Sequence, residues 1–298
     1  MRLSEYPHPD HLLVHVSDTH FAAEQVNPAT LHARERLQTL MSRLAQTGLR
    51  PEALVFSGDI ADRGEPDAYA MVREVVDPAA EAMGAKVIWV MGNHDDRGAF
   101  RAGLMGEASA DGEVDRVEWV GGLRIVVLDS TVPGHHWGEV TERQRGWLAE
   151  VLSEPAPQGT ILAMHHPPVP CVQDLAITVE LRDQRLLRPI LEGSDVRAIL
   201  GGHVHYSTFA TFAGIPVSVA ASTCYTQDLF MPGRGTAGRD AAQALNLVSV
   251  YDSTVLHSVI PIDEGVRVGR VVDELSTTRM LAEEGVALAP RRGELFAR

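Results

Sequence analysis

Residues 86–96, KVIWVMGNHDD, contain the pattern on which the prediction of the fold depends. A short apolar run, typical of a buried strand, is followed at once by glycine and by polar residues that can bind metal ions. Similar strand-like runs lead into HVSDTH (15–20), FSGDIADRGEP (56–66), LAMHHPP (162–168) and GGHVH (201–205). Ligands of an open α/β sheet bind beyond the carboxyl ends of its strands. We therefore expect these five strand ends to meet at one edge of one sheet.

Strand-like and helix-like segments alternate along the first two-thirds of the chain, which favours an α/β fold. Predicted strands cover residues 12–17, 53–57, 86–91, 123–128, 160–164 and 196–200. Predicted helices cover residues 30–46, 66–83, 141–152 and 182–191. After residue 205, consecutive strands are expected at 209–212, 217–220, 245–250 and 254–260. This pattern predicts mixed sheets packed face to face with helices outside. We expect a catalytic domain over residues 1–262 and a C-terminal extension over residues 263–298.

The composition of the 298-residue chain narrows the class of protein. Hydrophobic residues make up 45% of it, so a sizeable core can form. No apolar run approaches the roughly 20 residues of a transmembrane segment, and no secretory signal is evident. We therefore expect a cytoplasmic protein, with some peripheral envelope association left open. A net charge of -14 argues against binding to a nucleic acid polymer. Two cysteines, Cys171 and Cys224, are too few for a disulfide scaffold or a thiolate cluster.

Seven side chains at the predicted strand ends form a candidate set of metal ligands. Two pairs, Asp18 with His20 and His203 with His205, are spaced by two residues, so an extended backbone would point both members to one side. Glycines at positions 58, 92 and 202 would permit close backbone approach beside them. Each motif alone also fits a turn or a buried histidine, but five such motifs in order make a shared site the better interpretation. The candidate ligands are Asp18, His20, Asp59, Asn93, His165, His203 and His205.

The types of these side chains indicate which metals they could bind. Mixed imidazole and oxygen donors without a thiolate suit Mn, Fe, Zn, Co or Ni. Seven ligands exceed what one tetrahedral ion needs. If one carboxylate bridges, each of two ions receives four protein bonds. Two ions about 3.5–4 Å apart suit in-line displacement at phosphorus, and a bridging water loses its proton near neutral pH.

In this order, the motifs resemble those of the calcineurin-like metallophosphoesterases. The longer phrases, together with VPGHHWGE (132–139), VELRDQ (179–184) and CYTQDL (224–229), are similar to bacterial class III cyclic AMP phosphodiesterases. The resemblance covers about residues 6–262. It implies a four-layer α/β/β/α sandwich with two mixed β-sheets, and it implies a homodimer.

The resemblance also implies how the ligands are divided between two ions. One ion would be bound by Asp18, His20, Asp59 and His205. The other would be bound by Asp59, Asn93, His165 and His203. Asp59 is then the bridge. The implied metals are iron and manganese, with Zn, Co or Ni remaining open.

Two further residues are candidates for catalysis. His94 follows the candidate ligand Asn93, so it should lie beside a bound phosphate and stabilise developing charge or protonate the leaving oxygen. Asp62 occupies the position that orients this histidine in related phosphatases, although it could instead cap a helix. His135 and His136 lie in a loop that could close over a substrate, or else lie on the surface. Substrate contacts are expected from His20, Asp59, Asn93, His94 and His205.

The sequence therefore predicts a phosphodiesterase. The expected reaction is hydrolysis of a 3′,5′-cyclic nucleotide, cAMP or also cGMP, to the 5′-monophosphate by attack of a metal-bridging hydroxide. One alternative is a broader phosphodiesterase that acts on 2′,3′-cyclic nucleotides or glycerophosphodiesters. Another is a metal-stabilised, envelope-associated interaction protein that uses the tail after residue 263.

Overall fold

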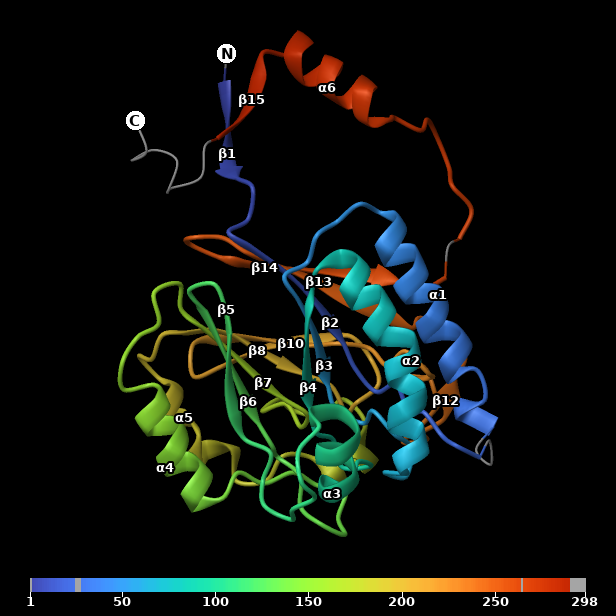
Figure 1. The fold of residues 1–298 in the computed structure, drawn as a ribbon, viewed down its shortest axis with the longest axis vertical. Helices are drawn as coiled ribbons and strands as arrows, with labels where there is room; N and C mark the ends of the chain where they lie inside the picture. The colour runs from blue at the N-terminus through green and yellow to red at the C-terminus, as the bar shows by residue number, and fades with distance from the viewer. Residues whose placement is uncertain (1, 25–27, 264, 290–298) are drawn as a thin grey trace.

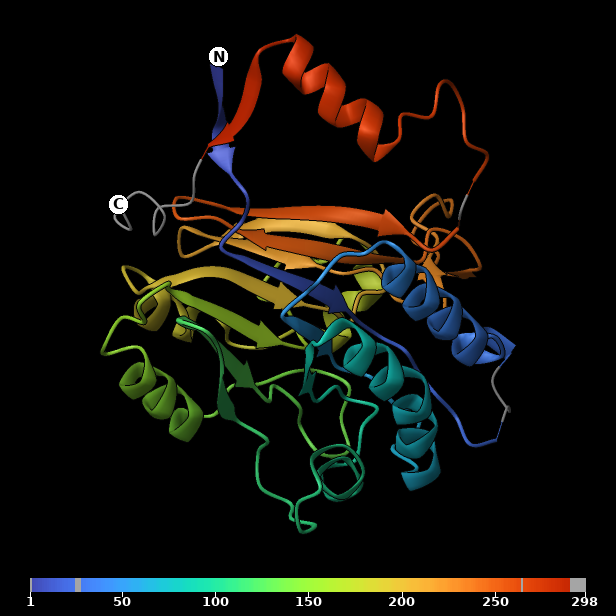
Figure 2. The same cartoon turned by 45° about the horizontal axis from the view of Figure 1, so that its top comes forward.

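Two β-sheets, stacked face to face, form the centre of the molecule (Figures 1 and 2). The computed structural model describes residues 2–24, 28–263 and 265–289. None of the helices in these residues is long and apolar enough to cross a membrane.

The first sheet has five strands in the order β14-β13-β2-β3-β4. Strands β2, β3 and β4 run parallel, whereas β13 is antiparallel to both β2 and β14, so the sheet is mixed. The strands are β2 (His11–Val16), β3 (Ala53–Ser57), β4 (Lys86–Val90), β13 (Ala244–Val250) and β14 (Val255–Pro261).

The second sheet has six strands in the order β5-β6-β7-β8-β10-β9. Its four inner strands run parallel, and β5 and β9 are antiparallel edge strands, so this sheet is also mixed. The strands are β5 (Arg116–Val120), β6 (Leu123–Leu128), β7 (Thr160–Met164), β8 (Val196–Gly201), β9 (Thr208–Phe212) and β10 (Ile215–Val219).

Helices cover the outer face of each sheet. Side chains of α1 (Ala33–Gln46) and α2 (Pro66–Met83) share a core with β2 and β3, and those of α4 (Glu142–Val151) and α5 (Arg188–Leu191) share one with β6 and β7. Helix α4 begins with a capping box, in which the side chains of Thr141 and Gln144 each bond to the backbone of the other residue. The expected four-layer α/β/β/α sandwich with two mixed sheets is confirmed.

The alternation of side chains along each strand separates three hydrophobic cores. On β2, Leu13 faces the core between the sheets, whereas Val14 and Val16 face the helices. On β3, Val55 and Phe56 divide in the same way. Both faces of these strands are buried, so they are apolar almost throughout. This explains why they appear in the sequence as continuous hydrophobic runs.

Helix prediction was wrong at residues 182–191. The structure has a 3₁₀ turn at Gln184–Leu186 and then only the single turn of α5. Pro189 lacks an amide hydrogen and disfavours helical geometry in the residue before it, so it fits only at the start of a helix. The helix expected at 30–46 begins three residues later, at Ala33.

The shorter elements are the 3₁₀ turns Pro28–Thr30 and Asp174–Val179, α3 (Arg97–Phe100), the π-helical turn Arg101–Met105, β11 (Thr226–Gln227) and β12 (Gly238–Arg239).

Both ends of the described chain pair to form an arm, and the sequence did not predict this pairing. Strand β1 (Arg2–Pro7) pairs in parallel with β15 (Val286–Ala289), which follows α6 (Glu274–Glu283). Figures 1 and 2 show these three elements standing apart from the stacked sheets, beyond β14. The strand pairing joins residues from the first segment of the chain to the extension. The domain boundary at residue 262 stays a prediction.

Two histidines in the first sheet, one buried and one partly buried, should make the fold sensitive to acid. Burial lowers the pKa of His257, on β14, to about 4, and burial, with the nearby His257, lowers that of His15, on β2, to about 3. Both ring nitrogens of His257 are buried without a hydrogen-bond partner in the described chain. Unfolding restores a pKa of about 6.5, so the unfolded chain binds these protons first. The contribution of these two neutral histidines to the free energy of unfolding is therefore complete above about pH 6.5. It is lost progressively as the pH falls toward about 4.

Replacing His257 with valine should therefore shift the midpoint of acid unfolding to lower pH. Circular dichroism of metal-free wild type and variant, titrated from pH 7.5 to 3.5, measures the shift. His32→Gln is the matched control, because the His32 side chain is 51% exposed and should leave the midpoint unchanged. An unchanged midpoint in His257→Val would show that His257 does not contribute to the acid sensitivity.

Candidate metal centre

The candidate ligands converge, but they come from two sheets rather than from one. Asp18, Asp59 and Asn93 follow β2, β3 and β4 of the first sheet, whereas His165 follows β7 and the His203–His205 pair follows β8 of the second. The expectation of a single sheet edge was therefore wrong. The sheets are stacked with these carboxyl ends on the same side, so face-to-face packing brings the two groups of loops together.

Four of the seven residues form one compact cluster. One ligand atom each of Asp18, His20, Asp59 and His205 lies within 4.8 Å of the other three. The Nε2 atoms of His20 and His205 are 3.1 Å apart. His205 Nε2 also lies 3.3 Å from Asp18 Oδ1. These four residues are those that the resemblance assigns to one ion.

The other candidate ligands surround the opposite side of Asp59. His165 Nε2 lies 3.3 Å from Asp59 Oδ2 and 3.3 Å from His203 Nδ1. The same Asp59 oxygen lies 3.5 Å from His20 Nε2 in the first cluster. One carboxylate oxygen is thus shared by both clusters, which is the position that a bridging ligand needs.

Asn93 provides an independent test of whether a cation fits here. Its side-chain oxygen Oδ1 is buried and has no hydrogen-bond partner in the described part of the chain. A buried oxygen without a partner is costly, and hard or borderline cations bind amide oxygens. The donor set of carboxylate, amide and imidazole groups therefore fits metal ions on both sides of Asp59.

Each candidate imidazole is held by a hydrogen bond from its other nitrogen. Three of them donate to a backbone carbonyl: His165 Nδ1 to that of Ser57 (2.7 Å), His203 Nε2 to that of Val179 (2.8 Å) and His205 Nδ1 to that of Tyr225 (3.0 Å). Such bonds fix the tautomer and direct the second nitrogen to a metal. His203 thus presents Nδ1 to the centre, whereas His165 and His205 present Nε2.

The backbone is strained at this site. Five of the seven candidate ligands have left-handed φ angles: Asp18 (52°), His20 (45°), Asp59 (50°), His203 (74°) and His205 (61°). This conformation costs a non-glycine residue about 1–2 kcal/mol. The prediction that an extended backbone aligns Asp18 with His20 was therefore wrong, although both side chains do reach the cluster.

The three glycines beside the candidate ligands have the role expected of them. A Cβ atom on Gly58 would lie 2.4 Å from His165 Nδ1, and one on Gly92 would lie 2.0 Å from the Asp59 amide nitrogen. A Cβ on Gly202 would lie 1.8 Å from Ser17 Oγ and 2.7 Å from Asp18 Oδ2. Only glycine permits this approach of the loops without displacement.

Asp62 contacts both His20 and His94, by different groups. Its carboxylate lies 3.1 Å from His20 Nδ1, whereas its backbone carbonyl accepts a hydrogen bond of 2.7 Å from His94 Nδ1. The alternative of a helix cap is wrong, because Glu65 is the N-cap of α2. The backbone carbonyl of Asp62 is thus placed to orient His94, whereas the Asp62 carboxylate contacts His20.

The charges in the cluster favour ionised carboxylates. Burial would raise the pKa of Asp59, but His165 and His94 outweigh it and hold that pKa well below its usual range. Burial would lower the pKa of His94, but Asp59 and Asp62 raise it. The lowered pKa of Asp59 favours the carboxylate that can bind cations, and the raised pKa of His94 favours the protonated form that can donate a proton.

Two residues shape the centre although the sequence assigned no role to Asp95 and left the role of His136 open. The buried carboxylate of Asp95 accepts hydrogen bonds from the amides of Gly92, Ile60 and Ala61, and so ties the loop after β4 to that after β3. Its place two residues after Asn93 was the available signal. For His136 the sequence allowed either a loop that closes over the substrate or a surface position. In the structure its Nδ1 lies 3.0 Å from Asn93 Nδ2.

The neighbouring histidines have structural contacts. His135 stacks on Trp137 with ring centroids 3.6 Å apart. His166 bonds to Ser130 Oγ and to the His136 carbonyl, so both of its nitrogens are engaged. It therefore supports the loop that carries His136.

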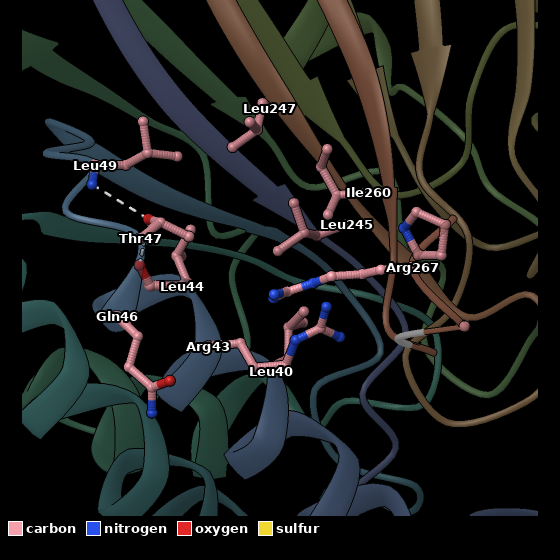
Figure 3. Close-up of a pocket in the computed structure, with 12 residues that line it drawn as sticks. Leu40, Arg43, Leu44, Gln46, Thr47, Leu49, Leu245, Leu247, Ile260 and Arg267 are labelled. Carbon is pink, nitrogen blue, oxygen red and sulfur yellow. Dashed lines mark hydrogen bonds between the residues drawn. The ribbon is translucent and has the colours of Figure 1, made fainter. Parts of the chain in front are cut away.

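A larger cavity than the one at the metal centre lies elsewhere. It has a volume of about 950 Å³ and lies between α1 and strands β13 and β14 (Figure 3). Its lining combines leucines such as Leu40 and Leu245 with Arg43 and Arg267, and includes none of the candidate ligands. A cavity of about 340 Å³ borders the metal centre instead, with Asn93 and His94 in its wall. The chemistry of the side chains, rather than cavity size, locates the site.

The chain is similar to proteins that are named as cyclic nucleotide phosphodiesterases. The chain is 55% identical over 288 residues to a protein of Rhodococcus erythropolis named "probable cyclic nucleotide phosphodiesterase", covering 97% of this chain and 96% of the relative. It is 55% identical over 298 residues to a cAMP/cGMP dual specificity phosphodiesterase of Mycobacterium tuberculosis, covering 99% and 94%.

The fold and the sequence point to one family. A dimetal phosphatase from Danio rerio has the same fold, with a TM-score of 0.62 and 16% identity over 86% of this chain and 98% of that one. The family model for calcineurin-like phosphoesterases matches residues 11–207, which contain all seven candidate ligands. This chain therefore belongs to the calcineurin-like phosphoesterase family.

Proposed function

We propose that this protein hydrolyses 3′,5′-cyclic nucleotides, cAMP and cGMP, to 5′-nucleoside monophosphates. The observation that carries the chemistry is the pair of clusters that share Asp59 Oδ2. The substrate class is supported by the two relatives of 55% identity, whose names specify cyclic nucleotides. We further propose a cytoplasmic homodimer.

The residues would hold two metal ions in the division that the resemblance implies. Asp18, His20 and His205 would hold one, and Asn93, His165 and His203 the other, with Asp59 between them. Iron and manganese suit these donors, as do Zn, Co and Ni. When bound, the two ions would neutralise phosphate charge and acidify a water molecule.

His94 is the proposed general acid. Its Nδ1 donates to the Asp62 carbonyl, which leaves Nε2 as the nitrogen that can protonate the departing 3′ oxygen. The nearby Asp59 and Asp62 raise the pKa of His94, which favours the protonated form that a general acid needs. His20, Asp59, Asn93, His94 and His205 would together surround the phosphate.

Replacing His94 with glutamine should lower kcat for cAMP by about 10²–10⁴-fold, the usual contribution of a general acid. Both metals should remain, because His94 is not among the candidate ligands. Bis(p-nitrophenyl) phosphate is the control substrate: its leaving group needs little protonation, so its kcat should fall far less. Equal losses for the two substrates, with the metal content intact, would remove the role of His94 as acid.

A substrate panel tests the proposed function directly. We expect kcat/KM to be larger for 3′,5′-cAMP and cGMP than for 2′,3′-cyclic nucleotides and glycerophosphodiesters, measured on one metal-loaded preparation. Equal or larger values for the latter substrates would favour the broader phosphodiesterase. Metal binding without any hydrolysis would favour the interaction protein, and fractionation of a chain truncated after residue 262 would then test the envelope association.

A further inference from the structure

The cavity beside His94 has a part that the proposed chemistry does not use. Its volume of about 340 Å³ lies within the range of small-molecule sites, about 300–1,000 Å³. Asn93 and His94 form the wall toward the metal centre. Met91, Val132 and Pro133 supply apolar surface, and Asp111 lies in the lining as well.

The chemistry of the reaction decides which part of the substrate enters this cavity. If His94 protonates the departing 3′ oxygen, the ribose that carries this oxygen must lie next to His94. The base is attached to the same ribose ring. It therefore extends from the His94 side of the phosphate, where the cavity opens.

We propose that this cavity is the nucleoside subsite and that the Asp111 carboxylate accepts a hydrogen bond from the amino group of a purine base. The proposal rests on the proposed function, because it assumes a cyclic nucleotide on the metal centre. Ionised carboxylates only accept hydrogen bonds. Adenine carries its exocyclic amine on C6 and guanine carries one on C2, so guanine would have to turn in the cavity to reach the same acceptor.

Asp111 is held in place by a fixed arginine. Its backbone carbonyl accepts a hydrogen bond of 3.0 Å from Arg97 Nη1, and Arg97 also donates to Asp129 Oδ2 and to the Thr131 carbonyl, each at 3.0 Å. This arrangement ties the loop of Asp111 to the loop that supplies Val132. The guanidinium of Arg97 is thereby engaged, whereas the Asp111 side chain is exposed and makes no hydrogen bond or ion pair to another described residue.

Besides Arg97, three other charged residues line the cavity: Asp95, Asp96 and Arg63. Both carboxylate oxygens of Asp95 already accept hydrogen bonds within the fold. Asp96 Oδ1 accepts from the amide of Ala99 and caps α3, so that oxygen is occupied. Arg63 is exposed at the cavity. Asp111 is therefore the carboxylate with both oxygens open to a ligand.

The contribution of the 6-amino group of cAMP to recognition can be tested with the wild-type protein. Purine riboside 3′,5′-cyclic monophosphate lacks only the 6-amino group of cAMP. We expect wild type to hydrolyse it with a kcat/KM about fivefold lower than that for cAMP, mainly through KM, as for one charged hydrogen bond at an exposed site. Asp111→Ala, which removes the acceptor, should lower kcat/KM for cAMP by a similar factor and hydrolyse the two nucleotides equally well.

Calorimetry provides a readout that is independent of turnover. Asp111→Ala should bind 5′-AMP about fivefold more weakly than wild type, with inorganic phosphate bound equally by both. Glu150→Ala, which removes an exposed carboxylate on α4, is the matched control and should bind 5′-AMP and inorganic phosphate as wild type does. Val132→Phe should raise KM for both cyclic nucleotides, because it narrows the cavity.

The outcomes separate the two proposals. Wild type that hydrolyses no cyclic nucleotide would overturn the proposed function. Wild type that hydrolyses cAMP but does not distinguish it from the purine analogue would overturn the role of Asp111. Unchanged nucleotide KM values in Val132→Phe would exclude the base from this cavity.

Discussion

Replacing Asp59 with asparagine should lower kcat/KM for cAMP by about 10³-fold or more. Asp59 Oδ2 lies between His20 and His165, at 3.5 and 3.3 Å, so its charge serves both proposed metal sites. Charge stabilisation by bound metal contributes several kcal/mol to such reactions, and about 1.4 kcal/mol corresponds to a factor of ten in rate. The neutral amide should also reduce the metal content per chain, measured by mass spectrometry of the elements.

The control for this prediction is a carboxylate outside the clusters. Asp77→Asn removes a partner of Arg73 in an exposed ion pair on α2 and should change kcat/KM less than twofold. Asp59→Asn that keeps full activity with two bound ions would show that Asp59 does not bridge.

Replacing Gly92 with alanine should have the second large effect, although it removes no ligand. The new Cβ would lie 2.0 Å from the Asp59 amide nitrogen and 2.3 Å from its Oδ1, so the loops after β3 and β4 must separate. A misplacement of about 1 Å can cost about 10²-fold in rate, which is the loss we expect in kcat/KM. Overpacking should also lower the free energy of unfolding by about 1–3 kcal/mol, measured by denaturant titration.

Gly146→Ala is the matched control. Gly146 lies inside α4, and a Cβ there would meet nothing within 4 Å. Alanine favours a helix over glycine by about 1 kcal/mol, so this variant should keep activity and gain stability. If Gly92→Ala behaves like Gly146→Ala, close approach of the two loops is not required.

Much of the fold was predictable because its strands are buried on both faces. Short continuous apolar runs such as Ala53–Ser57 and Thr160–Met164 are typical of buried strands, and a candidate ligand follows each within two residues. The order of the motifs then indicated the candidate ligands without any knowledge of distances. Helix α2 was equally clear, with Pro66 at its start and Gly84 after its end.

The remaining features depend on contacts between distant segments. The pairing of β1 with β15 joins the two ends of the described chain, and neither strand has a strong apolar alternation of its own. The left-handed backbone at Asp59 and His205 is imposed by the meeting loops and contradicts the local preference of both residues. The bond from His94 to Asp62 uses a backbone carbonyl, which residue types cannot reveal.

The most direct test of the account is the number of metal ions bound per chain. Purified protein, stripped with chelator, reloaded with Mn²⁺ and dialysed, should retain two ions per chain by elemental mass spectrometry, because Asp59 joins two complete sets of donors. Retention of one ion or none, in protein that nevertheless hydrolyses phosphodiesters at full rate, would contradict it.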